Sequence, residues 1–379
     1  MSNSAKPVRV ALMGSRHVRD MLHDITLGVV AYKRGAAHWQ LVGSAERPML
    51  TESEVDLKAI DGLIGFFNKP QWGDTLREAG VTAVNISSKV EDLPLPRVGS
   101  DDEAVGRMGG EHLLACGFAH FGFFDVDRGW FALRRLAGFA DVVEGQAGRT
   151  CHVFPAIGPT SDLSAVIGRW LAALPKPAGV MAASDFLGRA LIQQALALGF
   201  RVPDDVAVLG VNNDSWLTEL ATVPMSSIEL NAKDIGYEAA KMLDGLMAGE
   251  VHQRALWIPP VGVVPRQSTD IVIADDPVVG PALAYIRDHC HKGIRVEDVA
   301  NVVHVSRRTL EARLKRALGY TPQVAIQRAR VNRARKMLIE TDATMSRIAV
   351  DCGFGCESRF FIVFKRETGM TPGQYRRQY

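Results

Sequence analysis

The sequence predicts a two-lobed α/β part followed by an all-α domain that contains two helix-turn-helix units. Three observations support this prediction. Short apolar runs alternate with helical patterns from about residue 8 to residue 268, a fifty-residue repeat occupies the last hundred residues, and positive charge is concentrated in that last part. Steady alternation of strand and helix is typical of open parallel sheets, whereas short helix pairs joined by a tight turn are typical of DNA-binding units.

A first lobe is predicted over residues 8–125. Its strands are short apolar runs, several of them bounded by glycine or polar residues, at 8–13, 39–44, 61–67, 81–86 and 121–124. Helical patterns lie between them at 21–33, about 55–60, 72–79 and 104–116. Buried parallel strands have this continuous apolar character. The lobe is therefore predicted to be a parallel sheet with helices on its faces.

A second lobe is predicted over residues 130–260, because the same alternation starts again there. Its strands are predicted at 151–154, 179–183 and 205–211, and its helices at 134–144, 163–174, 187–198 and 237–246. Two successive lobes suggest a clamshell that binds its ligand in the cleft, where the carboxyl ends of the strands carry polar residues. The two lobes form a predicted domain 1–272, which a linker at 273–279 joins to a predicted domain 280–379.

The last hundred residues contain one pattern twice. Leu-Lys-Arg at 314–316 with Gly-Tyr-Thr-Pro at 319–322 returns as Phe-Lys-Arg at 364–366 with Gly-Met-Thr-Pro at 369–372. A short helix and a tight connection precede each copy, which predicts helix-turn-helix units at about 296–317 and 346–368. Ser306 is a good N-cap for the second helix of the first unit, which is predicted to start at Arg307. In the second unit, Gly353 can adopt the left-handed conformation that ends a helix.

These motifs resemble known families. The closing run 364–376 is similar to the AraC/XylS-type DNA-binding domain. The connection between the two helices is one residue longer in the second unit than in the first, which is also similar to that domain. The segments 135–139, 183–185, 206–214 and 236–243 resemble the LacI/GalR-type, periplasmic-binding-protein-like sugar sensor. In LacI-type repressors the DNA-reading helices precede the sensor, whereas here they follow it, an order that resembles bacterial regulators of pentose (xylose-like) utilisation.

The resemblance implies a sugar-responsive, sequence-specific DNA-binding transcription regulator, an activator of pentose (xylose-like) utilisation genes. Repression, or a response to another monosaccharide, is the alternative, and a sugar-processing enzyme is a remote one. The expected partners are a double-stranded DNA operator, a small sugar effector, a second copy of the chain in a homodimer, and RNA polymerase; no membrane is expected.

The charge is divided along the chain. From residue 278 to the end there are 19 Lys/Arg against 9 Asp/Glu, a net charge of +10, whereas the preceding part has 25 against 33, a net charge of −8. A basic tail on an acidic body indicates a nucleic-acid partner for the tail. Five scattered cysteines and a short polar N-terminus without a signal-peptide pattern lead us to expect a reducing, cytoplasmic location.

No catalytic motif has the required context. The chain lacks a Gly-x-Ser-x-Gly elbow, a phosphate-binding Gly-Lys-Ser/Thr loop and a His-Glu-x-x-His helix. We therefore expect no catalytic residue, no metal site and no cofactor, and we predict that the protein is not an enzyme.

The ligand-binding residues predicted by the resemblance are Arg135, Asp185 and Asn212. Arg135 lies where the LacI-type fold places a sugar-contacting arginine, and the other two residues close two strands at the cleft. The alternatives are that Asp185 caps the helix that follows and that residues 212–213 form a turn. Asn212 departs from the aspartate more usual in the family. Trp72 and Trp130 are candidates for stacking on a sugar, with core packing as the alternative.

The start of the second helix in each unit is predicted to meet base edges in the major groove. The residues at these positions are Arg307, Arg308, Glu311, Glu357, Ser358 and Arg359. A phosphate contact or plain exposure to solvent is the alternative for each. Phe361 and Ile362 are predicted either to touch thymine methyl groups or to pack inward. Four arginines between the units are predicted to follow the phosphates: Arg328, Arg330, Arg333 and Arg335.

Overall fold

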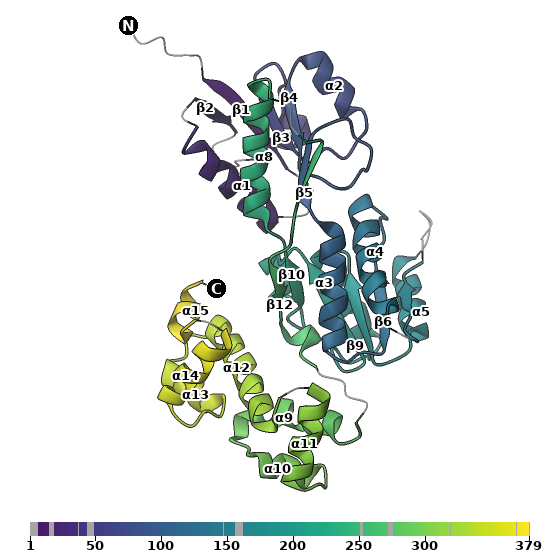
Figure 1. The fold of residues 1–379 in the computed structure, drawn as a ribbon, viewed down its shortest axis with the longest axis vertical. Coiled ribbons are helices and arrows are strands. Elements are labelled where there is room, and N and C mark those ends of the chain that lie inside the picture. The colour runs from purple at the N-terminus through teal and green to yellow at the C-terminus, as the bar shows by residue number, and fades with distance from the viewer. Residues whose placement is uncertain are drawn as a thin grey trace. The chain divides into compact units, whose positions relative to one another are not determined.

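The computed structural model describes residues 7–14, 19–36, 38–43, 49–146, 148–155, 162–250, 253–271, 276–318, 320–368 and 370–378. The chain divides into two compact units, Met1–Asp270 and Ile271–Tyr379 (Figure 1). The first unit is built from two sheets with helices, and the second is helical. No helix among the described residues is long and apolar enough to cross a membrane.

The first sheet has the strand order β11-β5-β4-β3-β1-β2, and all its pairs are parallel. Its strands are β1 (Val8–Met13), β2 (Trp39–Val42), β3 (Gly62–Gly65), β4 (Thr82–Asn85), β5 (Arg97–Ser100) and β11 (Ala255–Ile258). The helices of this lobe are α1 (Arg19–Lys33), α2 (Trp72–Ala79) and α8 (Ala232–Met247). Aliphatic side chains of β1, β3, β4, α1 and α8 form one buried cluster.

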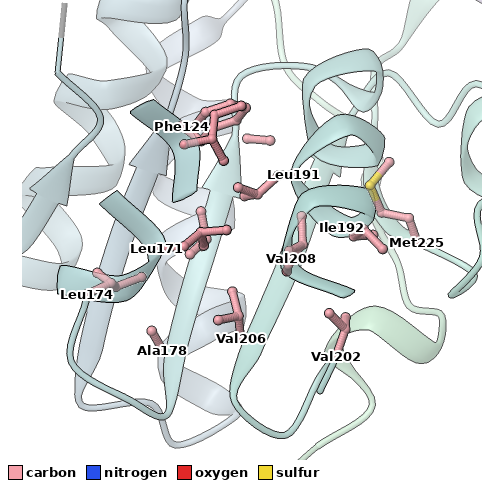
Figure 2. Close-up of a cluster of buried hydrophobic side chains, with 14 of the residues drawn as sticks. Phe124, Leu171, Leu174, Ala178, Leu191, Ile192, Val202, Val206, Val208 and Met225 are labelled. Carbon is pink, nitrogen blue, oxygen red and sulfur yellow. The ribbon is translucent and has the colours of Figure 1, made fainter. Parts of the chain in front are cut away.

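The second sheet has the order β12-β10-β9-β8-β6-β7 and is parallel except for the β10–β12 pair. Its strands are β6 (His120–Phe124), β7 (Cys151–Val153), β8 (Ala178–Ala182), β9 (Val206–Val211), β10 (Ser226–Glu229) and β12 (Gly262–Val264). Its helices are α3 (Asp102–Ala115), α4 (Trp130–Glu144), α5 (Leu163–Ala173), α6 (Asp185–Ala197) and α7 (Ser215–Thr218), with a 3-10 turn at Gln267–Thr269. Figure 2 shows part of its core, in which Leu171 and Val208 pack below Phe124.

The chain crosses between the two sheets three times, after β5, after β10 and after β11. Helix α3 and strand β6 therefore belong to the second lobe, while α8 and β11 return to the first. The predicted lobe ranges of 8–125 and 130–260 are wrong in this respect. Alternation of strand and helix shows that a sheet exists, but it does not show which sheet a strand joins.

Each lobe contains one helix pair packed backbone to backbone through glycines. A Cβ atom at Gly28 would lie 2.0 Å from the carbonyl oxygen of Lys233, and one at Gly236 would lie 2.1 Å from that of Ile25. In the second lobe, Gly106 of α3 and Gly138 of α4 approach the partner backbone in the same way, at 2.0 and 2.1 Å. The glycines inside these helical patterns are thus explained by helix packing, with α3 held tightly against α4.

A helix predicted at about 55–60 is absent from the structure. Thr51 instead starts a single 3-10 turn, Glu52–Glu54, in which the Glu54 carboxylate accepts the N–H of Thr51 at 2.7 Å. The Asp56 carboxylate then accepts the N–H of Lys58 at 3.0 Å, which closes a second turn. Side-chain bonds to the local backbone compete with helix formation in this way.

The second unit consists of α9 (Val279–His289), η3 (Cys290–Lys292), α10 (Val296–Val302), α11 (Arg307–Leu318), α12 (Pro322–Glu340), α13 (Met345–Asp351), α14 (Glu357–Thr368) and α15 (Pro372–Gln378). The two helix-turn-helix units, α10–α11 and α13–α14, each have a buried cluster, and α12 joins them. Ser306 accepts the N–H of Thr309 at 3.1 Å, as expected of an N-cap. Gly353 has φ +77°, as predicted, and His304 has φ +53° in the first connection.

Candidate functional sites

Arg135 and Asp102 form a buried ion pair where α3, α4 and the end of β8 meet. The Arg135 side chain is 6% exposed and that of Asp102 is 1% exposed. Arg135 Nε and Nη2 both lie 2.8 Å from Asp102 Oδ1, and Nη1 donates to the carbonyl oxygen of Ala183 at 2.6 Å. Asp102 Oδ2 is buried and has no partner among the described residues. The pair therefore holds three elements together and leaves one carboxylate oxygen available as an acceptor.

Asp185 is fully buried at the start of α6, and both its oxygens accept bonds from the protein. Ser227 Oγ donates to Oδ1 at 2.6 Å, and the N–H of Asp214 donates to Oδ2 at 2.8 Å. A Cβ atom at Gly210 would lie 2.1 Å from Oδ1, so β9 can pass this carboxyl only as glycine. The structure therefore places Asp185 beneath the strand end, as a link between α6, β9 and β10.

Asn212 and Asn213 form a strained turn directly above this link. Their φ angles are +113° and +52°, a region that side chains other than glycine adopt at a cost of about 1 kcal/mol or more. The N–H of Asn213 donates to Ser227 Oγ at 2.9 Å, so the Asp185 network supports the turn. Asn213 Oδ1 is buried without a partner among the described residues. Strain held in place at a strand end is a feature of binding sites.

The alternatives weighed for these residues are partly realised. Ser184 caps α6, since its Oγ accepts the N–H of Leu187 at 3.4 Å, and Asp185 occupies the first helical position instead. Residues 212–213 do form a turn. The structure links Asp185 through Ser227 to Asn213, the neighbour of Asn212 in the turn. Arg135 reaches the carbonyl oxygen of Ala183, at the end of β8 in the same sheet.

Hydrogen bonds connect the two lobes beside these strand ends. Asp20, in the first turn of α1, accepts from the N–H of Ser215 at 2.9 Å and from its Oγ at 2.5 Å. A second hydrogen bond between the lobes runs from the N–H of Phe131, in α4, to the carbonyl oxygen of Ser88, which follows β4, at 2.8 Å. A ligand that alters either lobe's strand ends can therefore change contacts made by the other lobe.

The two tryptophans proposed for stacking have different surroundings. Trp72 is 9% exposed and packs edge-on against Phe67, with ring centroids 5.3 Å apart, so it belongs to the core. Trp130 packs against Trp257, with ring centroids 5.5 Å apart, and the guanidinium of Arg97 lies 5.1 Å from the Trp130 centroid. This cluster joins α4 of the second lobe to β5 and β11 of the first.

Polar residues at strand ends of the first lobe were missed by the sequence reasoning. Asn85 ends β4, where its Oδ1 accepts the N–H of Ser87 at 2.8 Å and its Nδ2 is buried without a partner among the described residues. Ser87 Oγ donates to Asn68 Oδ1 at 2.6 Å. The signal was present in the sequence, because each residue directly follows or ends an apolar run that was predicted as a strand.

Replacing Asp185 by asparagine should remove a pH dependence of the first unit's stability. Burial raises the pKa of this carboxyl from 3.8 to about 7. The folded state then keeps a proton that the unfolded chain releases, so the free energy of unfolding falls as pH rises from about 4 to 7. At about 1.4 kcal/mol per pH unit, this dependence amounts to about 3 kcal/mol between pH 5 and pH 7. Urea unfolding at pH 5 and pH 8 should show a smaller difference in Asp185→Asn, and equal differences would contradict this.

The residues predicted to read bases lie at the surface of two helix starts. Five of them are exposed and Glu311 is half-buried: Arg307, Arg308, Glu311, Glu357, Ser358 and Arg359. They form two groups of three, one at the start of α11 and one at the start of α14. Each group lies within about one turn at the start of its helix, and their contacts with bases stay a prediction.

Charged partners distinguish the members of these groups. Arg307 pairs with Glu297 at 2.5 Å and with Glu311 at 2.8 Å, so two of the predicted readers neutralise one another. Glu357 accepts a hydrogen bond from Ser346 of the preceding helix. Among the described residues, Arg308 has no carboxylate within ion-pair distance, which leaves its guanidinium available to a base or a phosphate.

Three arginines of α12 make contacts within the domain, and one is Arg333, whose Nε donates to the carbonyl oxygen of Asp351 at 3.2 Å. Arg330 is 5% exposed, and it donates to the carbonyl oxygens of Cys290 and Ile294, both at 3.0 Å. The prediction that Arg330 follows the phosphates is therefore wrong, because its guanidinium bonds the backbone carbonyl at the start of η3 and another two residues after η3. Arg328 lies 3.5 Å from a carboxylate oxygen of Glu367, and 4.6 Å from a tyrosine ring centroid.

Among the described residues, no group of three His, Cys, Asp or Glu side chains could hold a metal ion. All five cysteines are free, and only Cys356 is exposed. Burial raises the pKa of the Cys116, Cys151 and Cys352 thiols to about 12, which suppresses thiolate chemistry there.

Comparisons with known proteins match both units. Residues 111–269 match the periplasmic binding protein-like domain family, and residues 299–378 match a helix-turn-helix domain family. The xylose operon regulatory protein of Haemophilus influenzae is 30% identical over 335 residues, which cover 84% of this chain and 85% of that protein. The xylose operon regulatory protein of Escherichia coli is 30% identical over 327 residues, which cover 83% of each chain.

Solved structures give the same picture. The structure of the xylose-binding transcription activator xylR is similar with a TM-score of 0.69 and 27% identity, over 99% of both chains. The transcriptional regulator CelR in complex with cellobiose is similar over 70% of this chain and 86% of that chain, with a TM-score of 0.55 and 23% identity. The second likeness shows the fold alone.

Proposed function

Because the chain belongs to the family of the bacterial xylose operon regulatory proteins, we propose that it activates pentose-utilisation genes in response to xylose or a close relative of xylose. One observation carries the proposal: a two-lobed α/β unit is joined to a double helix-turn-helix unit, in an order matched by the xylR structure along 99% of both chains. The known relatives are transcription regulators, and repression or another monosaccharide effector is the alternative.

The proposed sugar site lies at the strand ends of the second lobe. The bonds of Arg135 to Asp102 and to the backbone use three of its five N–H donors, so donors remain for sugar hydroxyls. Asn212 supplies an amide on the adjoining turn, and Asp102 Oδ2 and Asn213 Oδ1 are unpartnered acceptors among the described residues. Asp185 has both oxygens bonded within the protein, so we assign it to supporting the Asn212 turn.

The proposed response to sugar is closure of the two lobes. The bond between Asp20 and Ser215 already links α1 of one lobe to α7 of the other. A sugar that bonds both sets of strand ends stabilises the closed arrangement by its differential affinity for that state. Closure would then change how the helix-turn-helix units are presented to DNA.

The proposed DNA site comprises α11 and α14 in successive major-groove segments, about 34 Å apart. Basic charge in this part of the chain supplies the attraction to phosphates. A homodimer through the first unit would present four reading helices, and an activator also contacts RNA polymerase. We propose a cytoplasmic location, which agrees with binding to chromosomal DNA and with five free cysteines.

Thermal unfolding of the full chain with a panel of pentoses and hexoses tests the sugar part of the proposal. Xylose or a close pentose should raise the melting temperature, because a ligand at 100 times its Kd adds about 2.7 kcal/mol to the stability of the folded state. Fluorescence anisotropy with promoter DNA should show an affinity that falls steeply with salt and changes with the same sugar.

Asn212→Gly tests the proposed amide contact, since the Asn212 side chain makes no hydrogen bond among the described residues and glycine adopts φ +113° without strain. The variant should not lower the melting temperature of the free protein, and it should lose the stabilisation by sugar. A hexose as the only stabilising sugar would support the alternative effector. Stabilisation by no sugar at all, or DNA binding without sequence preference, would contradict the proposed function.

A further inference from the structure

The outer face of α14 carries a large aliphatic side chain at its centre. Three residues of the helix point into the domain and are 4% exposed or less: Phe360, Val363 and Phe364. Ile362, on the opposite side, is 69% exposed, the largest exposed fraction among the exposed large hydrophobic side chains of the described residues. Its neighbour Phe361 is half-buried and packs edge-on against Phe360, with centroids 5.8 Å apart. The two hydrophobic residues therefore have opposite placements.

Ile362 lies on the same helix face as a predicted base reader. It follows Ser358 by four residues, so the two side chains are neighbours on the outer surface of α14. Ser358 is exposed as well. Ile362 is not part of the buried cluster of the α13–α14 unit. Its apolar side chain is left in water, beside the charged residues on the outer face of α14. Single exposed apolar residues are common, but this one lies one turn from a predicted base reader, so whatever binds that face of α14 would contact it.

The first helix-turn-helix unit, α10–α11, has a matching arrangement. Fifty residues earlier, α11 carries the exposed Ala312 at the position of Ile362 and the exposed Arg308 at the position of Ser358. Each reading helix thus presents one aliphatic group at the centre of its outer face, one turn after a polar residue. On α11 the aliphatic residue is the short Ala312 and the polar residue is the long cation Arg308. On α14 the aliphatic residue is the longer Ile362 and the polar residue is the short Ser358.

We propose that Ile362 packs against the 5-methyl group of a thymine in the major groove. This contact makes thymine the preferred base at one position of the half-site, the DNA segment that α14 of the second helix-turn-helix unit reads. The inference rests on the proposed function, which places α14 against DNA. Thymine is the one base with an apolar group on its major-groove edge. An isoleucine has no donor or acceptor, so against any other base it would cover polar atoms without bonding them.

The base contacts of α11 and α14 are expected to differ because their outward-facing side chains differ in length. Arg308 can make two bonds to the paired acceptors of guanine, and the short Ala312 beside it leaves space for that contact. Ser358 bonds less selectively, so at the base that it shares with Ile362 the isoleucine supplies the discrimination. The second half-site then has a methyl contact in addition to the predicted contacts of Glu357 and Arg359.

The test uses the full chain and its own selected DNA. Duplexes are first selected from a random-sequence library, and each thymine of the best duplex is then replaced singly by deoxyuridine, which lacks only the methyl group. We expect one position in one half-site to weaken binding about fourfold, the factor for one buried methyl group at about 0.8 kcal/mol. Anisotropy measures each affinity.

The variant Ile362→Ala should lose this sensitivity to deoxyuridine, and its own selection should no longer specify thymine at that position. Val350→Ala is the matched control, because Val350 is 58% exposed on the first helix of the same unit and should leave the sensitivity unchanged. Both side chains are exposed, so thermal unfolding should be unaltered in both variants. Equal deoxyuridine sensitivity in wild type and Ile362→Ala, or none in either, overturns the inference while the proposed function stands. Failure of the full chain to select any sequence overturns both.

Discussion

Replacing Gly353 by alanine should destabilise the second unit by about 3 kcal/mol or more and reduce its affinity for DNA at least tenfold. Gly353 has φ +77°, where any other residue costs about 1–2 kcal/mol. A Cβ atom there would also lie 2.4 Å from the carbonyl oxygen of Cys290 and 3.1 Å from that of His291. Both neighbours are backbone atoms, so the turn must move away from η3 and take the second helix-turn-helix unit with it.

Arg330 makes this close approach important for the whole domain. From α12 it donates to the carbonyl oxygen of Cys290, the same oxygen that Gly353 approaches, and a Cβ atom at Gly353 would lie 3.2 Å from Arg330 Nε. This is the point at which the two helix-turn-helix units are fixed to each other. Displacing the turn should therefore disturb both the stability of the unit and the spacing of its reading helices.

Gly355→Ala is the matched control in the same connection. Gly355 has φ +80°, but a Cβ atom there would meet nothing within 4 Å. It should lose only the conformational part, about 1 kcal/mol. Thermal unfolding and DNA anisotropy measure both variants, and the first unit should keep its stabilisation by sugar in each. Equal losses for Gly353→Ala and Gly355→Ala would show that the approach to η3 contributes nothing.

The helix-turn-helix units were predictable because their information is local. Spacing, capping residues and the fifty-residue repeat all lie within one segment, and the structure confirms Ser306 as a cap and Gly353 as left-handed. The first connection differs, because His304 has φ +53° where the second connection has glycine. Histidine adopts the left-handed region more often than most residues but far less often than glycine, so this feature was not predicted.

The arrangement of the two sheets was less predictable. The strands β5, β10, β11 and β12 are short, and they were not predicted. β5 and β11 complete the first sheet, and β10 and β12 complete the second; β11 and β12 join after the chain has passed through the other sheet. Pairing partners far apart in the chain, such as Ala255 with Arg97, leave no periodic signal within either segment. The sequence therefore predicted the fold class correctly and the lobe ranges incorrectly.

The candidate sugar site shows the same limit at the level of single residues. Arg135, Asp185 and Asn212 were found from their resemblance and from their place at strand ends. Their partners come from elsewhere: Asp102 starts α3 and Ser227 lies on β10. Because these partners bond Arg135 and Asp185 within the protein, position in the sequence could not separate residues that contact a ligand from residues that support the contact.

Removing the guanidinium of Arg135 by the change Arg135→Met should destabilise the first unit by about 3–5 kcal/mol. The change leaves the Asp102 carboxylate buried without its cation and the carbonyl oxygen of Ala183 without its donor. Urea unfolding measures the loss. Arg107→Met is the matched control, because the Arg107 side chain is 43% exposed and lies 3.8 Å from Glu103, and it should lose less than about 1 kcal/mol. Equal losses in the two variants would contradict the importance of burial.

The double variant Asp102→Leu/Arg135→Met separates support from ligand contact. Two apolar residues remove the stranded charge, so the double variant should recover roughly half of the lost stability. The proposed sugar contact of Arg135 is still absent, and the recovered protein should show no stabilisation by the sugar that stabilises the wild type. A double variant that regains both stability and the wild-type sugar response would assign Arg135 to support alone, and would leave the turn at Asn212 as the ligand contact of the second lobe.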